Sequence, residues 1–143
     1  MSAWSEWKNV QYIQQFAGSY KWPGVYRLRT IGSDNNSSPF PIGRLFGIDK
    51  CGLLSIGESV NVARRLKEFN DACVGKVGKH PAGEKRFLFQ ILNAPRKDFT
   101  IQFSARRTKD KTEARKQQGI LQLRYFRKHG ELPPLNSNFG GVW

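Results

Sequence analysis

Apolar residues recur at helical spacing in three parts of the chain. Between residues 4 and 16 every third position is apolar, which predicts a helix: Trp4, Trp7, Val10, Ile13 and Phe16. A second helix is predicted to begin at Ser59, a suitable N-cap residue, with this inner stripe: Val60, Ala63, Leu66 and Phe69. A third runs from about Asp110 or Thr112 to His129, with this inner face: Ala114, Gln118, Leu121 and Tyr125.

Four shorter runs have the alternation or the apolar content of β-strands: Val25–Ile31, Arg44–Ile48, Leu53–Ile56 and Phe99–Phe103. The turn residues Asp49-Lys50-Cys51-Gly52 predict a hairpin between the second and third strands, with the first strand alongside. We therefore expect an α/β fold of the α+β kind, in which a small, mostly antiparallel three-stranded sheet is flanked by helices.

The remaining segments are read as loops or terminal signals. Residues 32–43 are dense in turn residues, and residues 74–85 form a loop of Gly, Lys and His. Periodicity does not decide between helix and strand for residues 86–92. Arg106–Lys111 is predicted to be a basic turn. The last helix carries a capping pair, Asp110 with Glu113, and ends before Gly130.

Composition adds one strong signal, which is charge. The chain has 143 residues, enough for one domain with a buried core. It contains 24 Lys and Arg against 11 Asp and Glu, giving a formal net charge of +13. A small domain this basic repels itself unless a polyanion is near, and nucleic acid is the commonest polyanion. DNA is therefore the expected partner, with salt-dependent binding.

The cysteines and the apolar runs bear on the compartment. Cys51 and Cys73 lie far apart, and with His80 and His129 they complete no zinc-ligand spacing. Free thiols are the default in a reducing cytoplasm. The N-terminal residues contain no apolar h-region, and no run reaches the ~18 apolar residues that span a membrane. A cytoplasmic protein without a membrane partner is expected.

Two stretches carry the candidate chemistry. Pro23 to Leu28 reads as a strand that displays an exposed phenol, Tyr26. Leu53 to Leu66 reads as a strand that ends at Gly57 and runs into a helix with two arginines. This arrangement would place backbone N–H groups and guanidinium groups around one small space, which is suited to a phosphate.

Four short motifs in these and later stretches resemble those of the GIY-YIG nuclease superfamily: Gly24-Val25-Tyr26, Ser55-Ile56-Gly57, Asn61 with Arg65-Leu66, and Pro134-Leu135-Asn136. The resemblance covers residues 23–136 and implies one GIY-YIG-like domain over 1–143, with an N-terminal helix and loop over 1–22 and a tail over 137–143. The long gap between the two triplets resembles restriction-type or repair-type members that carry an insertion.

The resemblance implies hydrolysis of a DNA phosphodiester with one Mg²⁺ or Mn²⁺ ion. Tyr26 would handle the attacking water or its proton, although an unperturbed phenol has a pKa of about 10. Arg65 would stabilise charge on the phosphate oxygens. Ser55 and Asn136 occupy the other catalytic positions of the motifs.

The chain departs from the family pattern at two positions. Ser55 stands where the second triplet normally has tyrosine, and Gln118 stands where the metal-binding glutamate is expected. Gln117, one residue earlier, is also glutamine. A neutral amide is a weak ligand for a hard dication. Glu113, about one turn earlier, is a possible substitute, but it also fits the capping position of the helix.

Several polar and basic residues are predicted to contact nucleic acid: Asn61, Arg64, Lys79, His80, Lys85, Arg106 and Arg107. Three hypotheses follow. The chain is a DNA-binding endonuclease, inactivated if the glutamine is natural, or it is a non-catalytic nucleic-acid-binding module on a degenerate nuclease fold. A protein–protein adaptor on the same fold is the third.

Overall fold

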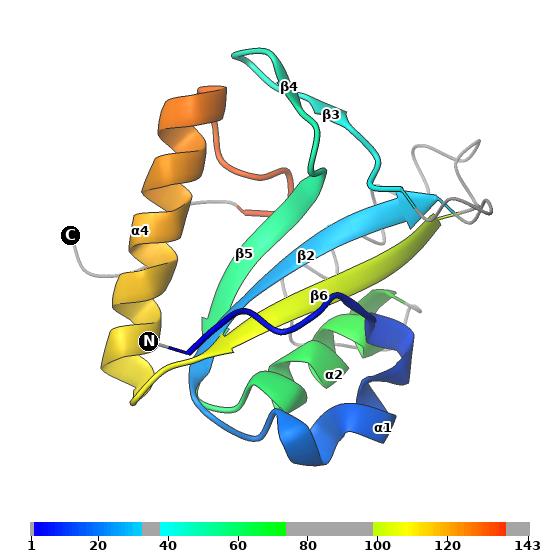
Figure 1. Cartoon of the computed structure of the whole chain (residues 1–143), viewed down its shortest axis with the longest axis vertical. Coiled ribbons are helices and arrows are strands. Elements are labelled where there is room, and N and C mark those ends of the chain that lie inside the picture. Colours follow the sequence, from blue (N-terminus) through cyan, green and yellow to red (C-terminus); the bar gives the residue numbers. More distant parts are fainter. Residues whose placement is uncertain (1, 33–37, 74–98, 137–143) are drawn as a thin grey trace.

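The computed structural model describes residues 2–32, 38–73 and 99–136 of the chain. Its centre is a four-stranded sheet in the order β1-β6-β2-β5, with every pairing antiparallel (Figure 1). The strands have these bounds: β1 Lys8–Asn9, β2 Gly24–Gly32, β5 Leu53–Ser59 and β6 Phe99–Arg107. The α+β class is confirmed.

The sheet has four strands and not the predicted three, and its pairing differs from the prediction. β6 contains the predicted strand Phe99–Phe103 but continues to Arg107, so Arg106 and Arg107 belong to a strand and not to a turn. It pairs with β2 along nine residues, and β5 pairs with the other edge of β2. Strand β2 therefore lies between the two other long strands, β5 and β6.

The predicted hairpin between Arg44–Ile48 and Leu53–Ile56 is wrong. Strands β3 (Ile42–Gly43) and β4 (Ile48–Asp49) instead pair with each other in a separate two-stranded ribbon. The Asp49 carboxylate accepts hydrogen bonds from three consecutive amides, those of Cys51, Gly52 and Leu53. These bonds turn the chain away from the ribbon and let β5 join β2.

The predicted N-terminal helix over residues 4–16 is also wrong. The Ser5 amide donates to the Ala105 carbonyl at 2.8 Å, and β1 extends this pairing along the edge of β6. Helical turns follow: η1 Val10–Tyr12, α1 Ile13–Phe16 and η2 Ala17–Ser19. Val10 and Ile13 are buried as the pattern predicted. Trp4 and Trp7 satisfy the same spacing without a helix, because they stack on arginines of the sheet.

Helix α2 (Val62–Cys73) begins three residues later than predicted. Ser59 is the last residue of β5, and Asn61 caps the helix by accepting a hydrogen bond from the Arg64 amide at 3.1 Å. Val62 is buried on the inner face of the helix, in place of Val60, which was predicted there but is 42% exposed. Leu66 and Phe69 are buried as predicted.

Helix α4 (Lys111–His129) has the predicted ends. The Asp110 side chain accepts from the Glu113 amide, and Gly130 closes the helix in the left-handed region with φ 78°. Of the predicted inner face, Ala114 and Tyr125 are buried, whereas Gln118 and Leu121 are only partly buried. Gln122, which was not predicted, is fully buried. The amide of Gln122 is tolerated there because it reaches the sheet, as described below.

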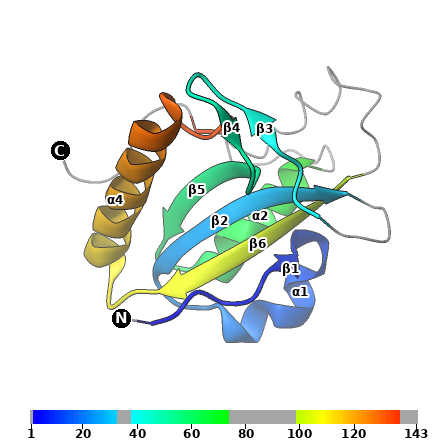
Figure 2. The same ribbon diagram turned by 45° about the horizontal axis from the view of Figure 1, so that its top comes forward.

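The main core lies between the sheet and α2. It joins aromatic and aliphatic side chains of both: Tyr26, Leu28, Phe103, Val62, Leu66 and Phe69. Helix α4 packs against β5 and β2, whereas α2 lies on the other side of the sheet (Figures 1 and 2). Within the described ranges, no helix is long and apolar enough to cross a membrane.

The ring of Tyr26 imposes a glycine on the neighbouring strand. Gly57 lies directly opposite Tyr26 in the β2–β5 pairing. A Cβ atom at position 57 would lie 2.7 Å from Cε2 of the ring and closer still to its Cζ and hydroxyl oxygen. Because Tyr26 is buried, its ring has no open space into which it can move.

We predict that Gly57→Ala lowers the free energy of unfolding by about 2 kcal/mol, the usual cost of overpacking a core. Gly43→Ala is the matched control, because a Cβ atom at position 43 meets nothing within 4 Å. The control should change stability by no more than about 0.5 kcal/mol. Urea titrations of the two variants measure the difference, and equal losses would contradict this account of Gly57.

Candidate functional site

Two of the predicted catalytic side chains lie together. Tyr26 on β2 faces α2, and the Arg65 guanidinium on that helix hydrogen bonds to the phenol. Arg65 also forms a salt bridge with Glu68 at 3.0 Å. The phenol is not exposed as the sequence predicted, since only 2% of Tyr26 is accessible to solvent. The phenol is therefore covered by α2, whereas 31% of the Arg65 side chain is exposed.

Burial governs the acidity of this phenol. Removal from water raises the pKa of Tyr26 to about 12, and the nearby charges of Glu58 and Glu68 push it the same way. The positive charge of Arg65 and its hydrogen bond lower the pKa but do not offset the burial. A phenol with this pKa stays protonated at neutral pH, so in this environment it is not a base.

The predicted ring of backbone N–H groups at the start of α2 is absent, because each amide there has an internal partner. The Val62 amide donates to the Trp22 carbonyl at 3.1 Å, and the Ala63 amide donates to the Tyr20 carbonyl at 3.0 Å. The Arg64 amide donates to the Asn61 side chain. The start of α2 can attract an anion through side chains but has no free amides in its first turn.

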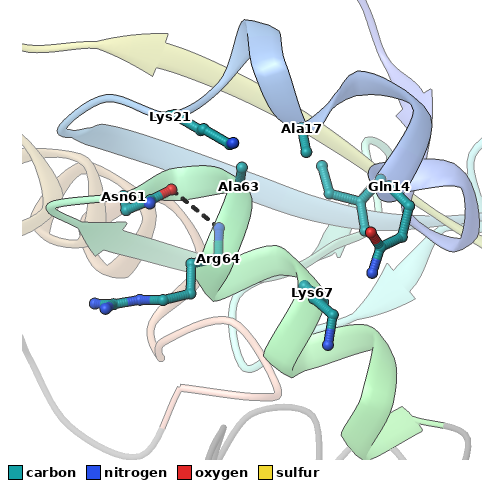
Figure 3. A pocket seen from close by; sticks show the side chains of 8 residues that line it. Gln14, Ala17, Lys21, Asn61, Ala63, Arg64 and Lys67 are labelled. Carbon is teal, nitrogen blue, oxygen red and sulfur yellow. Dashed lines mark hydrogen bonds between the residues drawn. The ribbon is translucent and has the colours of Figure 1, made fainter.

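A pocket of about 240 Å³ opens beside this helix start, between α2 and the N-terminal helical turns (Figure 3). Three cations line it, Lys21, Arg64 and Lys67, above an apolar floor of Ile13, Ala17 and Ala63. Lys67 is already paired with Asp71 at 3.0 Å. In Figure 3 the Arg64 guanidinium extends away from both lysines. The pocket can attract a small anion, but its cations do not converge on one point.

Three side-chain amides converge on a single carbonyl at the edge of the sheet. The Ile56 carbonyl of β5 accepts hydrogen bonds from Asn136 Nδ2 at 3.1 Å, Gln118 Nε2 at 3.2 Å and Gln122 Nε2 at 3.4 Å. Asn136 Oδ1 accepts from the Ile56 amide at 3.0 Å. Asn136 thus pairs with Ile56 as a neighbouring strand would.

Sequence reasoning assigned Gln118 and Asn136 to the site but missed Gln122. The available signal was its position four residues after Gln118, which places both amides on one helix face. Ser55, also predicted, is buried in β5 beside Ile56, opposite Leu28. The structure therefore brings Ser55, Gln118 and Asn136 to one strand, where the two amides bind the Ile56 backbone.

These residues do not fit a Mg²⁺ or Mn²⁺ ion, which binds several oxygen ligands including carboxylates. In the part of the chain that the structure describes, no group of three or more His, Cys, Asp or Glu side chains could hold a metal. Glu113 Oε2 accepts from the Lys109 amide at 2.5 Å, so it caps α4. Glu58 has one buried carboxylate oxygen without a hydrogen-bond partner among the described groups, and a single such oxygen is too few.

A set of stacked arginines and tryptophans lies on the face of the sheet away from α2. The Arg27 guanidinium lies 4.0 Å from the ring centre of Trp4, and the Arg29 guanidinium lies 4.1 Å from that of Trp7. Arg106 lies 4.6 Å from the ring centre of Trp4 and donates to the Gln117 side chain of α4. The alternation of Arg27 and Arg29 along β2 was the sequence signal for this arrangement.

Helix α4 carries the largest set of exposed cations on one element: Lys111, Arg115, Lys116, Arg124, Arg127 and Lys128. Its single acidic residue, Glu113, is engaged in capping. Arg107, at the end of β6, is exposed close to the helix start in sequence. Of the other residues predicted to bind nucleic acid, Lys79, His80 and Lys85 lie outside the described ranges.

Comparisons of the chain with protein-family models, curated proteins and solved structures found no match.

The pKa of Tyr26 predicts how stability depends on alkaline pH. The unfolded chain ionises its tyrosines near pH 10, whereas folded Tyr26 ionises near pH 12. A raised pKa in the folded state means that stability is intact below pH 10 and is lost as the pH rises from 10 to 12. The parent should lose about 1 kcal/mol more than Tyr26→Phe between pH 9 and pH 11.

Urea unfolding of the parent and of Tyr26→Phe at both pH values measures this difference. The other tyrosines are the same in both proteins, so their contributions cancel in the comparison. Parallel losses in the two proteins would show that Tyr26 ionises as a solvated phenol does.

Proposed function

We propose that this domain binds DNA through the phosphate backbone, with the exposed face of α4 as its principal contact. The observation that carries the proposal is the set of six exposed cations on one helix of 19 residues. Among the described side chains, none of the six forms a salt bridge. Cations without acidic partners on a protein of net charge +13 favour a polyanionic ligand.

The placement of the cations within α4 supports a binding role over a structural one. Arg127 and Lys128 lie in the last turn, where positive charge also stabilises the negative end of the helix dipole. Lys111 lies in the first turn, where positive charge is unfavourable. The helix dipole therefore accounts for the cations at the C-terminal end of α4 only, whereas binding to a phosphate backbone accounts for the cations at both ends.

The neighbouring face of the sheet adds to the same field. Burial lowers the pKa of Arg106 on β6, and the positive charge of Arg124 on α4 lowers it further, so these two cations repel one another. Such repulsion costs stability in the free protein and is relieved when a phosphate lies between the guanidinium groups. Cys51 and Cys73 are not joined in a disulfide, which suits a reducing cytoplasm, and we propose the cytoplasm as the compartment.

Phosphodiester hydrolysis is the second candidate, favoured by the contact between Tyr26 and Arg65 that the GIY-YIG resemblance implies. The high pKa of Tyr26 and the lack of a fitting metal site among the described residues favour binding without cleavage. A protein adaptor is the remaining alternative, and a chain that is not retained on DNA at low salt would support it.

The binding proposal predicts the effect of removing two cations from α4. Arg124→Gln with Lys128→Gln should weaken binding to a duplex oligonucleotide by about tenfold or more near 0.1 M salt. The slope of log affinity against log salt concentration should fall in magnitude by about 2, because each lost phosphate contact removes about 0.9. Fluorescence anisotropy over a salt series measures both quantities.

The matched control is Lys21→Gln with Lys67→Gln, which removes the same charge from the pocket beside α2. This control should change the affinity and the slope by much less than the α4 variant does. Equal effects of the two variants would mean that binding follows net charge alone. A larger loss of affinity in the control than in the α4 variant would indicate that DNA binds at the pocket beside α2.

A carboxylate at position 118 tests the nuclease alternative. Gln118 donates a hydrogen bond to the Ile56 carbonyl, so Gln118→Glu replaces a donor with an anion that faces a carbonyl oxygen. We expect the variant to be less stable by about 1–2 kcal/mol at neutral pH. We expect neither it nor the parent to cleave plasmid DNA with Mg²⁺ or Mn²⁺.

Gln117→Glu is the control, because the Gln117 amide oxygen accepts from Arg106 and a carboxylate can do the same. The control should keep the stability of the parent. Cleavage by Gln118→Glu alone would identify a nuclease inactivated by the glutamine. Cleavage by the parent would contradict the proposal that this domain binds without cutting.

A further inference from the structure

The tip of the β3–β4 ribbon displays large apolar side chains to solvent. Leu45 is 70% exposed and Phe46 is 60% exposed, and Ile48 on β4 is 62% exposed. Figure 1 shows the ribbon extending beyond the sheet beside the C-terminal end of α4. Neither the core nor the proposed phosphate contacts account for these side chains. We call residues 44–47 the ribbon tip.

The backbone of the ribbon tip is firmly attached. The Arg44 amide donates to the Gly47 carbonyl at 2.9 Å, which closes the turn, and Gly47 adopts a φ of 75° that favours glycine. The Phe46 amide donates to the His129 carbonyl at 2.9 Å. The Leu45 amide donates to the Glu131 carboxylate at 2.6 Å.

Further contacts hold the side chains of Arg44 and Phe46. Arg44 forms a salt bridge with Glu131 at 2.7 Å and donates to the Leu132 carbonyl. The Phe46 ring rests on Gly130, where a Cβ atom would lie 2.9 Å from it. The ribbon tip is thus held rigidly in a position that leaves Leu45 and the outer face of Phe46 uncovered.

The charges around the ribbon tip indicate which partner it fits. Three exposed cations adjoin the ribbon tip. Lys50 directly follows β4, and Arg127 and Lys128 precede His129, whose carbonyl accepts the Phe46 amide. The neighbouring carboxylates already have partners. Glu131 forms a salt bridge with Arg44, and the buried Asp49 carboxylate accepts hydrogen bonds from three amides and the Tyr125 hydroxyl. The exposed apolar tip therefore lies beside exposed cations, which suits an anionic partner with apolar surfaces inside.

Stacked bases between two phosphate backbones have that chemistry. We propose that the ribbon tip is a wedge that inserts Leu45 and Phe46 at a base step of the DNA bound along α4. Proteins commonly kink DNA by inserting apolar side chains between neighbouring base pairs, and an aromatic ring can stack on the exposed base. This inference rests on the proposed function, because α4 must first hold the phosphate backbone.

Unstacking of a base is the direct readout of a wedge. The probe is a set of duplex oligonucleotides with 2-aminopurine at successive positions, since the fluorescence of this base rises when it leaves the stack. The parent should bind and raise the fluorescence at one position or at two neighbouring positions. Leu45→Ala with Phe46→Ala should abolish the rise and weaken binding about tenfold. It should keep the salt dependence, because the phosphate contacts of α4 remain.

Two controls exclude unfolding and a general loss of apolar surface as causes of a changed signal. The ribbon tip is anchored through main-chain groups of Leu45 and Phe46, so the double variant should keep its fold, which circular dichroism checks. Val60→Ala is the control for loss of an exposed apolar side chain, since Val60 is 42% exposed and lies before α2. This control should raise the 2-aminopurine fluorescence as the parent does.

The outcomes separate the wedge from the proposed function. A parent that does not bind the duplex at low salt would overturn both. A parent that binds through α4 with no change in fluorescence would overturn the wedge alone, and so would an unchanged rise with the double variant. Self-association of the parent that the double variant loses, measured by sedimentation without DNA, would reassign the ribbon tip to a protein interface.

Discussion

The hydrogen bonds that converge on the Ile56 carbonyl fix the relation between α4 and the sheet. Two of the three donors, Gln118 and Gln122, belong to α4, and the third, Asn136, belongs to the segment that follows the helix. A buried carbonyl must be paired, and here its side-chain partners come from the helix and from the segment that follows it. One acceptor thereby determines the position and rotation of α4, and with them the direction in which its cations point.

The C-terminal end of α4 extends this constraint to the ribbon. His129 and Glu131 accept the amides of Phe46 and Leu45, so the ribbon tip is positioned by the helix and not by the sheet. At the other end of the ribbon, the Asp49 carboxylate accepts the Tyr125 hydroxyl of α4 at 2.9 Å. The proposed phosphate contacts and the proposed wedge therefore belong to one unit, because both are attached to a single helix.

Local chemistry made α4 and the two long strands predictable from the sequence. Asp110 and Gly130 mark the ends of α4 through capping and a positive φ, which require no knowledge of the fold. The alternation in Val25–Ile31 and Phe99–Phe103 likewise predicts strands, and both runs lie within strands of the structure. The contact between Tyr26 and Arg65 followed only from the motif resemblance, since their separation in sequence gives no local signal.

The remaining errors arose where a pattern had two physical causes. Trp4 and Trp7 have helical spacing, but the spacing serves stacking on Arg27 and Arg29, which no local signal reveals. Leu45 and Phe46 resembled strand residues because they are apolar, although they are exposed on a turn. Gln118 stands where the resemblance expects the metal-binding glutamate, and its observed role as a donor to Ile56 depends on a contact 62 residues away in sequence.

The coverage of β5 and β6, the two strands that pair with β2, also bears on how this protein avoids aggregation. β6 is a nine-residue strand with alternating apolar side chains, and an uncovered strand of that kind is a template for pairing with another chain. The short N-terminal pairing, from Ser5 to Asn9, occupies part of its free edge. On the opposite edge of the sheet, Leu135 and Asn136 occupy the outward groups of Leu54 and Ile56 in β5. These flanking segments thus leave neither β5 nor β6 with a fully open edge for a second molecule.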